Sequence, residues 1–316
     1  MRYSTLFAAA FATISALATA GTAQAEFPEK EITVIVNYGA GGATDLSTRT
    51  LARAMEKVLN VPLKVVNRPG GAGTVGPTIL ANSPNDGYTI GVTSFSPMAI
   101  QPAMREVPYS LEDFDVIGAT GRYRYGLAVQ SDSEFETIED LIEAAKAGKV
   151  TVSAAGPPNN IALHQLAGAT GGTFEWIPYS GGNEAIVALL SGEVDAAAQN
   201  PTDIVKHVES GALRMLVSIS PVRWFELPDV PTLLDLGYDI QIDSWAGLSA
   251  PAGVEASRLK VLEDAVSSAM NDPEVQGQFK NVGMDPAFMP GEEYQTFLRD
   301  GKETIAKQLK EIGMIE

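Results

Sequence analysis

Short runs of β-branched and aliphatic residues alternate along the chain with longer segments whose apolar residues recur at helical spacing. The first run, 32–38, is bounded by turn residues and predicts a buried strand. The segment from Leu46 to Leu59 has helical periodicity, and Asn60 is a plausible stop. A second run at 63–66 completes a β-α-β unit.

The same alternation continues and then begins again in the second half of the chain. A further strand is predicted at 88–93, and 115–119 and 126–130 are short apolar segments. From a strand at 150–154 onward, the order is once more β-α-β-α-β-α-β. Two successive blocks of this kind predict an α/β protein with two doubly wound domains.

The C-terminal tail, 255–315, has a different pattern. It is predicted to be helical, with breaks at 272–273 and 285–291, and to contribute few strands. Such a tail packs on a sheet built elsewhere. We expect the first block to host it, which makes the first domain discontinuous.

A glycine-rich turn, G-A-G-G-A-T-D at 39–45, joins the first strand to its helix. Backbone N–H groups at a helix N-terminus lie at the positive end of the helix dipole and bind anions, including carboxylates. The alternative is a tight turn whose glycines only satisfy backbone geometry. A second irregular turn of small residues, 155–160, follows the strand at 150–154, so the pattern occurs twice.

Other candidate contacts follow predicted strands, because ligands of open parallel sheets bind beyond the strand carboxyl ends. Ser94, Ser96 and Gln199 hold such positions, although ordinary loop residues would fit there too. Arg122 and Arg124 alternate with tyrosines in a predicted loop, which is either a carboxylate clamp or a solvated surface loop.

Composition narrows the functional class. A basic start, an apolar alanine-rich run and an A-x-A pattern ending at Ala25 predict a secretory signal peptide over 1–25. The chain has no cysteine, which excludes a thiol nucleophile and a thiolate metal site. A net charge of −17 argues against a nucleic-acid partner. Gly71, Gly73 and Gly76 fit G-x-G-x-x-G, but they do not follow the first strand, so no dinucleotide cofactor is predicted.

Six motifs in chain order resemble those of the solute-binding receptors of tripartite tricarboxylate transporters, the Bug or TctC-like family. Each is weak alone, but the ordered set spans almost the whole mature chain. The motifs are N-Y-G-A-G-G-A-T-D (37–45), N-R-P-G-G-A-G (67–73), N-D-G-Y-T (85–89), P-Y-S-G (178–181), L-P-D-V-P-T (227–232) and W-A-G-L-S-A-P (245–251).

This resemblance implies a periplasmic-binding-protein (Venus flytrap) fold, with two α/β lobes joined by crossing strands and closing on one small carboxylated solute. The expected lobes are 26–122 plus 247–316, and 123–246. Family-like ligand contacts in the first lobe are Tyr38, Ala40, Gly41, Thr44 and Asp45, and in the second lobe Ala155, Gly156, His164, Tyr179, Ser180 and Gly181. Asp45 is expected either to accept a hydrogen bond from the ligand or to cap the first helix, and His164 is more often a packing residue.

The chain departs from the family pattern in two loops. The family's second loop resembles G-x-G-S-x-x-H-L, but Asn160-Ile161 stands where Gly-Ser is expected. Asn159 or Asn160 is therefore expected to replace the serine contact. In the 121–125 loop, usually apolar in the family, we expect an arginine to pair with a distal carboxylate or polar group of the ligand.

The predicted function is a periplasmic receptor, with no cofactor or metal, that delivers a small carboxylate to the membrane subunits of a tripartite transporter. We expect it to be a monomer. The alternative is a secreted enzyme acting in the same cleft, but the chain lacks G-x-S-x-G and H-E-x-x-H motifs and has only two histidines. A ligand-presenting partner of a sensor would use the same fold, and the sequence does not name the solute.

Overall fold

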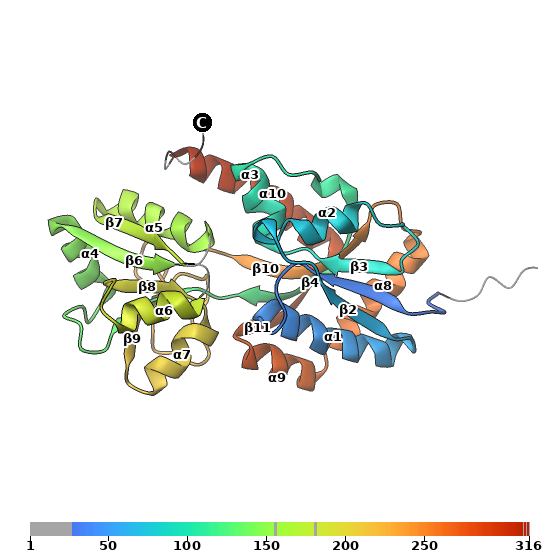
Figure 1. Ribbon diagram of the computed structural model, residues 1–316, viewed down its shortest axis with the longest axis horizontal. Helices are drawn as coiled ribbons and strands as arrows, with labels where there is room; N and C mark the ends of the chain where they lie inside the picture. Colours follow the sequence, from blue (N-terminus) through green and yellow to red (C-terminus); the bar gives the residue numbers. More distant parts are fainter. Residues whose placement is uncertain (1–26, 155–156, 180–181, 312, 314, 316) are drawn as a thin grey trace, which may run out of the picture.

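The computed structural model shows two α/β lobes side by side, connected by two strands in the middle of the molecule (Figure 1). It describes residues 27–154, 157–179, 182–311, 313 and 315. The predicted signal peptide, 1–25, lies outside the described residues.

The first lobe is built on a six-stranded mixed sheet in the order β11-β4-β10-β3-β1-β2. Strands β1, β2 and β3 are parallel to one another. In contrast, β10 is antiparallel to both β3 and β4, and β11 is antiparallel to β4. The strands are β1 (Ile32–Val36), β2 (Leu63–Asn67), β3 (Thr89–Val92), β4 (Phe114–Tyr123), β10 (Ser244–Pro251) and β11 (Met284–Pro290).

The second lobe has a five-stranded sheet in the order β7-β6-β8-β5-β9. In it, β6 is parallel to β7 and β8, and β5 is antiparallel to β8 and β9. The strands are β5 (Gly126–Gln130), β6 (Lys149–Ala154), β7 (Thr173–Pro178), β8 (Ala196–Gln199) and β9 (Leu213–Ser218).

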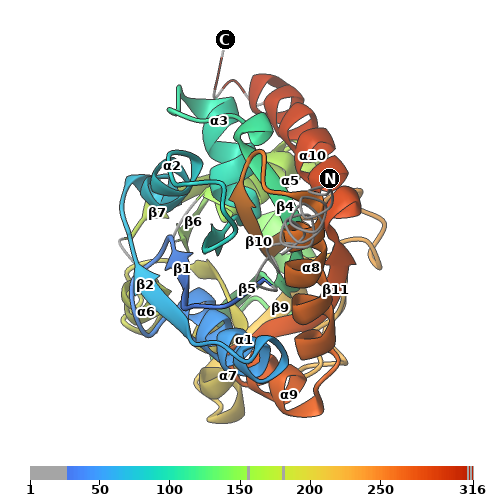
Figure 2. The ribbon, with the colours of Figure 1, turned by 90° about the vertical axis from the view of Figure 1, so that its right-hand side faces the viewer.

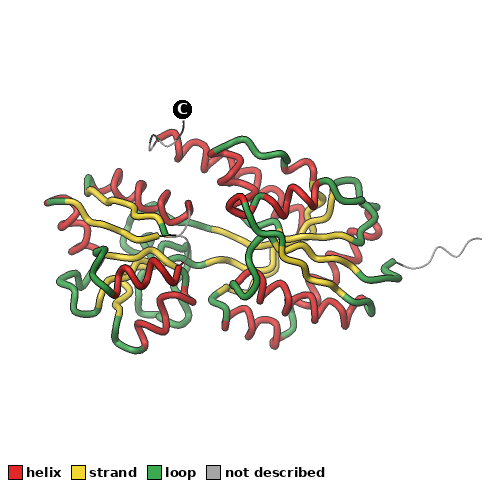
Figure 3. The backbone as a smooth tube through the Cα atoms, viewed as in Figure 1, coloured by secondary structure: helices red, strands yellow, loops and turns green. Residues whose placement is uncertain are grey.

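Helices cover both faces of each sheet (Figures 1, 2 and 3). On the first sheet, α1, α8 and α9 lie on one face, and α2, α3 and α10 on the other; on the second, α6 and α7 lie opposite α4 and α5. The helices are α1 (Ala43–Leu59), α2 (Val75–Ala81), α3 (Gln101–Met104), α4 (Ile138–Ala147), α5 (Pro157–Thr170), α6 (Gly182–Leu190), α7 (Pro201–Glu209), α8 (Ala256–Met270), α9 (Pro273–Asn281) and α10 (Gly291–Glu311), with short helical turns η1 (Gly71–Gly73), η2 (Ser96–Ile100) and η3 (Leu111–Asp113).

The hydrophobic core follows from the two periodicities of the sequence. Successive strand residues face opposite sides of a sheet. Val34 therefore packs with Leu51 and Met55 of α1, whereas its neighbour Ile35 packs with Leu80 of α2. In the parallel part, β1 and β3 are mostly buried on both faces, which explains their near-continuous apolar runs, whereas the edge strand β2 is only partly buried.

Two strands carry the chain between the lobes. β4 continues past Tyr123 directly into β5, and the chain returns through Ser244 into β10, which pairs with β4 over its whole length. The lobe boundaries at 122/123 and 246/247 stay a prediction. The tail helices α8, α9 and α10 pack on the first sheet.

Two local predictions were wrong, and the one at 285–291 was incomplete. The 121–125 segment is not a loop throughout, because β4 extends to Tyr123 along its partner β10. The expected break at 285–291 contains the strand β11, whose two prolines are tolerated because it lies at the edge of the sheet. The 155–160 turn is shorter than expected, since α5 begins at Pro157, and proline suits a first helical turn.

Within the described ranges, no helix combines the length and the apolar character needed to cross a membrane.

The contact between β10 and β4 predicts a sharp difference between two glycine substitutions. A Cβ on Gly247 would lie 2.6 Å from the Gly118 carbonyl oxygen and collide with the Tyr294 ring. Gly247→Ala should therefore lower the free energy of unfolding by about 2 kcal/mol or more.

Gly277→Ala is the matched control, because a Cβ there, inside α9, meets no atom within 4 Å. Alanine should stabilise that helix by about 0.5–1 kcal/mol. Urea unfolding of both variants measures the difference, and equal stabilities would contradict it.

Candidate functional site

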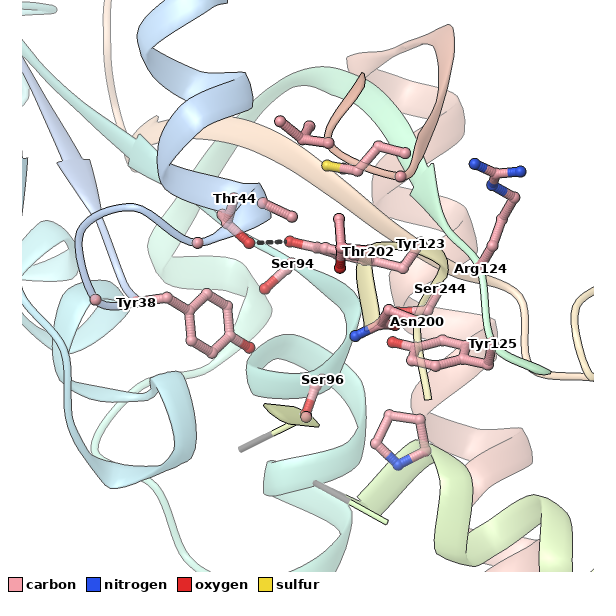
Figure 4. A pocket seen from close by; sticks show the side chains of 18 of the residues that line it. Tyr38, Thr44, Ser94, Ser96, Tyr123, Arg124, Tyr125, Asn200, Thr202 and Ser244 are labelled. Atoms are coloured by element: carbon pink, nitrogen blue, oxygen red, sulfur yellow. Dashed lines mark hydrogen bonds between the residues drawn. The ribbon is translucent and has the colours of Figure 1, made fainter. Parts of the chain in front are cut away.

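A cavity of about 770 Å³ lies between the two lobes (Figure 4). We call it the cleft cavity. Its described lining comes from the ends of strands in both sheets, from the crossing strands and from one turn of the C-terminal tail. The lining residues are Tyr38, Gly39, Ala40, Gly42, Ala43, Thr44, Ala72, Ser94, Ser96, Tyr123, Arg124, Tyr125, Pro158, Tyr179, Gly182, Asn200, Thr202, Ser244, Val282, Gly283 and Met284.

The carboxyl ends of the parallel strands bring several helix N-termini to this cavity. Lining residues belong to the first turns of α1, η2, α5, α6 and α7, which follow β1, β3, β6, β7 and β8. Each N-terminus carries a partial positive charge, and α1 and α6, which do not open with proline, also present N–H groups without intrahelical partners. The convergence of these N-termini contributes positive potential to the cavity without requiring a basic side chain.

Three tyrosine hydroxyls add neutral hydrogen-bonding groups. The Tyr123 hydroxyl lies 2.6 Å from the Thr44 hydroxyl, and Tyr38 and Tyr125 line the cavity together with Ser94 and Ser244. Burial raises the pKa of each of these tyrosines above the ordinary value. All three hydroxyls therefore stay protonated at neutral pH and can donate to an anion. Figure 4 shows the Tyr38 and Tyr125 rings pointing toward the space between Ser96 and Asn200.

Arg124 is the one basic residue among the described lining residues. Its side chain is fully buried and its guanidinium points away from the cavity centre (Figure 4). Nη1 and Nη2 donate to the two carboxylate oxygens of Glu226 at 2.6 and 2.9 Å, and the group lies over the Phe225 ring. This bidentate pair neutralises the charge inside the protein wall.

Arg122 does not line the cavity in the described structure. Its Nε lies 2.7 Å from a carboxylate oxygen of Asp243, and its guanidinium lies over Trp245. Both arginines thus have carboxylate partners within the chain, which argues against the predicted pairing with a ligand.

Asp45 holds the β1–α1 loop, residues 37–42, instead of facing the cavity. Its carboxylate is 2% exposed and accepts hydrogen bonds from the Gly41 N–H at 2.9 Å, from Asn67 Nδ2 at 2.8 Å and from Arg49 Nε at 3.0 Å. Burial alone would raise the pKa of Asp45, but these hydrogen bonds and the Arg49 charge outweigh it and lower the pKa. Both predicted roles, ligand contact and helix cap, are replaced by support of the loop.

The structure separates the predicted contacts into three groups. Those that line the cleft cavity are Tyr38, Ala40, Thr44, Ser94, Ser96 and Tyr179. Those outside its described lining are Gly41, Asp45, Asn159, Asn160, His164 and Gln199. Ala155, Gly156, Ser180 and Gly181 lie outside the described residues. That the cavity-lining residues of the first group contact the ligand stays a prediction.

The early start of α5 explains two of the misplacements. Asn159 lies inside the helix, buried, and its Nδ2 donates to the Ala198 carbonyl at 2.9 Å. His164 is the eighth residue of α5 and not a first-turn residue. Because α5 begins at Pro157, Asn159 falls in its first turn with its side chain turned to the Ala198 carbonyl, and His164 lies beyond that turn.

Several lining residues were missed. Asn200 and Thr202 directly follow β8, so the strand-end rule that selected Ser94 would also have found them. The sequence pattern drew attention to Tyr123 and Tyr125 only because they alternate with Arg122 and Arg124, and it did not predict them as site residues. Ser244 and the 282–284 turn carry no local signal, because only the tertiary fold brings them to the cavity.

A family model described as "Tripartite tricarboxylate transporter family receptor" matches residues 47–314 of this chain. The chain belongs to the tripartite tricarboxylate transporter receptor family. It is a two-lobed solute-binding protein with the predicted Venus flytrap fold.

Individual relatives of this tripartite tricarboxylate receptor agree. A Cupriavidus necator protein named "UPF0065 protein in gbd 5'region" is 33% identical over 307 residues, which cover 95% of this chain and 92% of that protein. BugT from Bordetella pertussis is 31% identical over 309 residues, 94% of this chain and 95% of BugT. The crystal structure of a TctC solute binding protein from Polaromonas, with no ligand, has a TM-score of 0.79 and 28% identity, covering 90% of this chain and 99% of that one.

The tyrosine hydroxyls of this receptor predict how binding responds to pH. Because the pKa of Tyr38, Tyr123 and Tyr125 is raised by burial, their hydroxyls keep their protons well above neutral pH. The described lining holds no histidine. Affinity for a carboxylate should therefore be constant between about pH 6 and about pH 9.

Isothermal titration calorimetry at fixed ionic strength measures this response. A fall in affinity centred between those limits would contradict the prediction, because it would require a titrating group in the site.

Proposed function

We propose that this receptor captures one small carboxylate between its lobes and delivers it to the membrane subunits of a tripartite transporter. The observation that carries the proposal is the convergence of five helix N-termini on one cavity whose described lining has no unpaired basic side chain. Such a site suits an anion held by N–H and O–H donors.

The chemistry of a carboxylate matches the donors in place. A carboxylate accepts about four hydrogen bonds. The β1–α1 loop and the first turn of α1 offer backbone N–H groups, and Thr44, Ser94 and Tyr123 offer hydroxyls beside them. Hydrogen bonds to an ionised acceptor are about twice as strong as neutral ones, so this cluster supplies affinity without an ion pair.

Binding between the lobes also provides the signal for delivery. Lining residues come from both sheets, so a ligand contacts the two lobes together only when they are close. Its differential affinity for the closed arrangement shifts the population toward that arrangement. A membrane partner can then recognise the relative position of the lobes.

The periplasm is the proposed location, and a monomer the proposed state. The predicted signal peptide over 1–25 supports export. We assign no catalytic step, since family and fold are those of solute-binding receptors.

A thermal-shift and calorimetry screen tests the proposal. Succinate, malate and benzoate sample the anion chemistry, and the corresponding amides serve as uncharged controls. At least one carboxylate should raise the melting temperature and bind one-to-one, while its amide does not. Turnover of a bound carboxylate, or equal binding of acid and amide, would overturn the proposal.

Tyr123→Phe tests the hydroxyl cluster directly. Removing this hydroxyl takes a donor from the cavity and leaves Thr44 without its partner at 2.6 Å. Affinity for the carboxylate selected by the screen should fall by about tenfold, the effect of one hydrogen bond to a charged group.

Tyr109→Phe is the matched control. Tyr109 is also buried, and its hydroxyl donates to the Pro97 carbonyl at 2.6 Å, but it does not line the cleft cavity. Wild-type affinity is expected for this variant. If Tyr109→Phe and Tyr123→Phe weaken binding equally, the Tyr123 hydroxyl has no specific role in the site.

A further inference from the structure

We propose that Asn67 and Arg49 are positioning residues that set the shape of the β1–α1 loop without touching the ligand. The inference rests on the proposed function, because it concerns the loop that forms one wall of the carboxylate site. Neither residue belongs to the described lining of the cleft cavity.

Asn67, the last residue of β2, ties the loop to the sheet at two points. Its Nδ2 donates to the Tyr38 carbonyl at 3.0 Å and to Asp45 Oδ1 at 2.8 Å. Asp45 in turn accepts the Gly41 N–H at 2.9 Å. One side-chain amide therefore fixes both ends of the segment 38–41, directly and through Asp45.

Arg49 completes the network from one turn further along α1. Its Nε lies 3.0 and 3.1 Å from the two oxygens of Asp45, and its Nη2 donates to Asn67 Oδ1 at 2.9 Å. The planar guanidinium reaches both partners at once, which an ammonium group cannot do. Arg49 thus orients the Asn67 amide so that its NH₂ group faces the loop.

The network has a direct consequence for the cavity. Gly41 has φ +84°, and its N–H is turned toward Asp45 and away from the ligand space. The neighbouring residues Ala40 and Gly42 line the cavity. Holding Gly41 in this conformation therefore decides which backbone groups of the loop face the ligand.

The glycine-rich segment after Asn67 supports the same loop from a second side. A Cβ on Gly73 would lie 3.0 Å from the Tyr38 hydroxyl oxygen, and a Cβ on Gly76 would lie 2.7 Å from the Asn37 Cβ. The Asn37 side chain also donates to the Gly73 carbonyl at 3.2 Å. The 67–76 segment packs behind the β1–α1 loop. Ala72 is its one residue in the described lining of the cleft cavity, so this packing accounts for the rest of the motif.

Hydrogen–deuterium exchange on the ligand-free protein tests the positioning role. Asn67→Ala should speed exchange of the backbone amides in 39–44 by about tenfold, the effect of losing about 1.4 kcal/mol of local stability. Exchange elsewhere in the first lobe should stay at its wild-type rate. Asn85→Ala is the control, because the Asn85 amide also donates to a carbonyl, that of Gly253, but away from the cleft cavity.

Arg49→Lys gives a second, milder variant that keeps the charge. It should also speed exchange in 39–44, and Arg258→Lys, whose arginine donates to the Asp86 carbonyl, should not. Unchanged exchange in 39–44 in both Asn67→Ala and Arg49→Lys, or an even rise across the lobe, would overturn the inference.

Binding of succinate, malate and benzoate to the same variants connects the loop to the site. Asn67→Ala should lower the affinity for the carboxylate that binds wild-type protein by about tenfold, and Asn85→Ala should leave this affinity unchanged. Faster exchange with wild-type affinity would overturn the role in binding. If none of the three binds wild-type protein, the proposed function fails for them, while exchange alone still decides whether Asn67 and Arg49 hold the loop.

Discussion

The pairing of β4 with β10 is the constraint on which the site depends. These strands are antiparallel neighbours inside the first sheet, and both run out of it toward the second lobe at the cleft cavity. Tyr123, Tyr125 and Ser244 line the cavity because they lie where the strands leave the sheet. The same geometry buries Arg124 and pairs it with Glu226. Removing one partner of such a buried pair costs about 3–5 kcal/mol of stability. The Arg124 guanidinium therefore stays paired with Glu226 in the cavity wall.

An acidic protein can bind an anion because the two effects act over different distances. The net charge of −17 is spread over a large surface, and exposed charges are screened beyond about 8 Å at physiological salt. Hydroxyls and N–H groups act at contact distance, inside a cavity that water reaches less freely. The overall charge therefore affects how fast an anion approaches. Under the proposed function, the local donors decide how tightly it is held, and Tyr123 and Thr44 are the candidates.

The α/β class and the position of the β1–α1 loop at the end of the first strand followed from the sequence because both depend on local patterns. The strand at β1, the glycine turn and α1 are adjacent in the chain, and the family motifs fixed the order of the rest. The directions of the side chains could not be predicted from the sequence. Asp45 faces Gly41, and Arg124 faces Glu226, 102 positions away, so only tertiary structure reveals that neither is free for a ligand. The tail turn at Gly283 reaches the cavity for the same reason, through packing against Pro201 and Thr202.

The prolines at the helix starts connect these local choices to selectivity. Pro157 and Pro158 open α5, Pro201 opens α7, and Pro97 follows the first residue of η2. Proline has no N–H, so these three N-termini keep their dipoles but lose backbone donors. The hydroxyls of Thr202 and Ser96 and the amide of Asn200 stand beside them in the cavity. Under the proposed function, α1 is the source of directional backbone donors for a carboxylate, whereas the opposite wall offers side-chain groups. We propose that the part of the ligand facing Asn200 then sets which solute this receptor prefers.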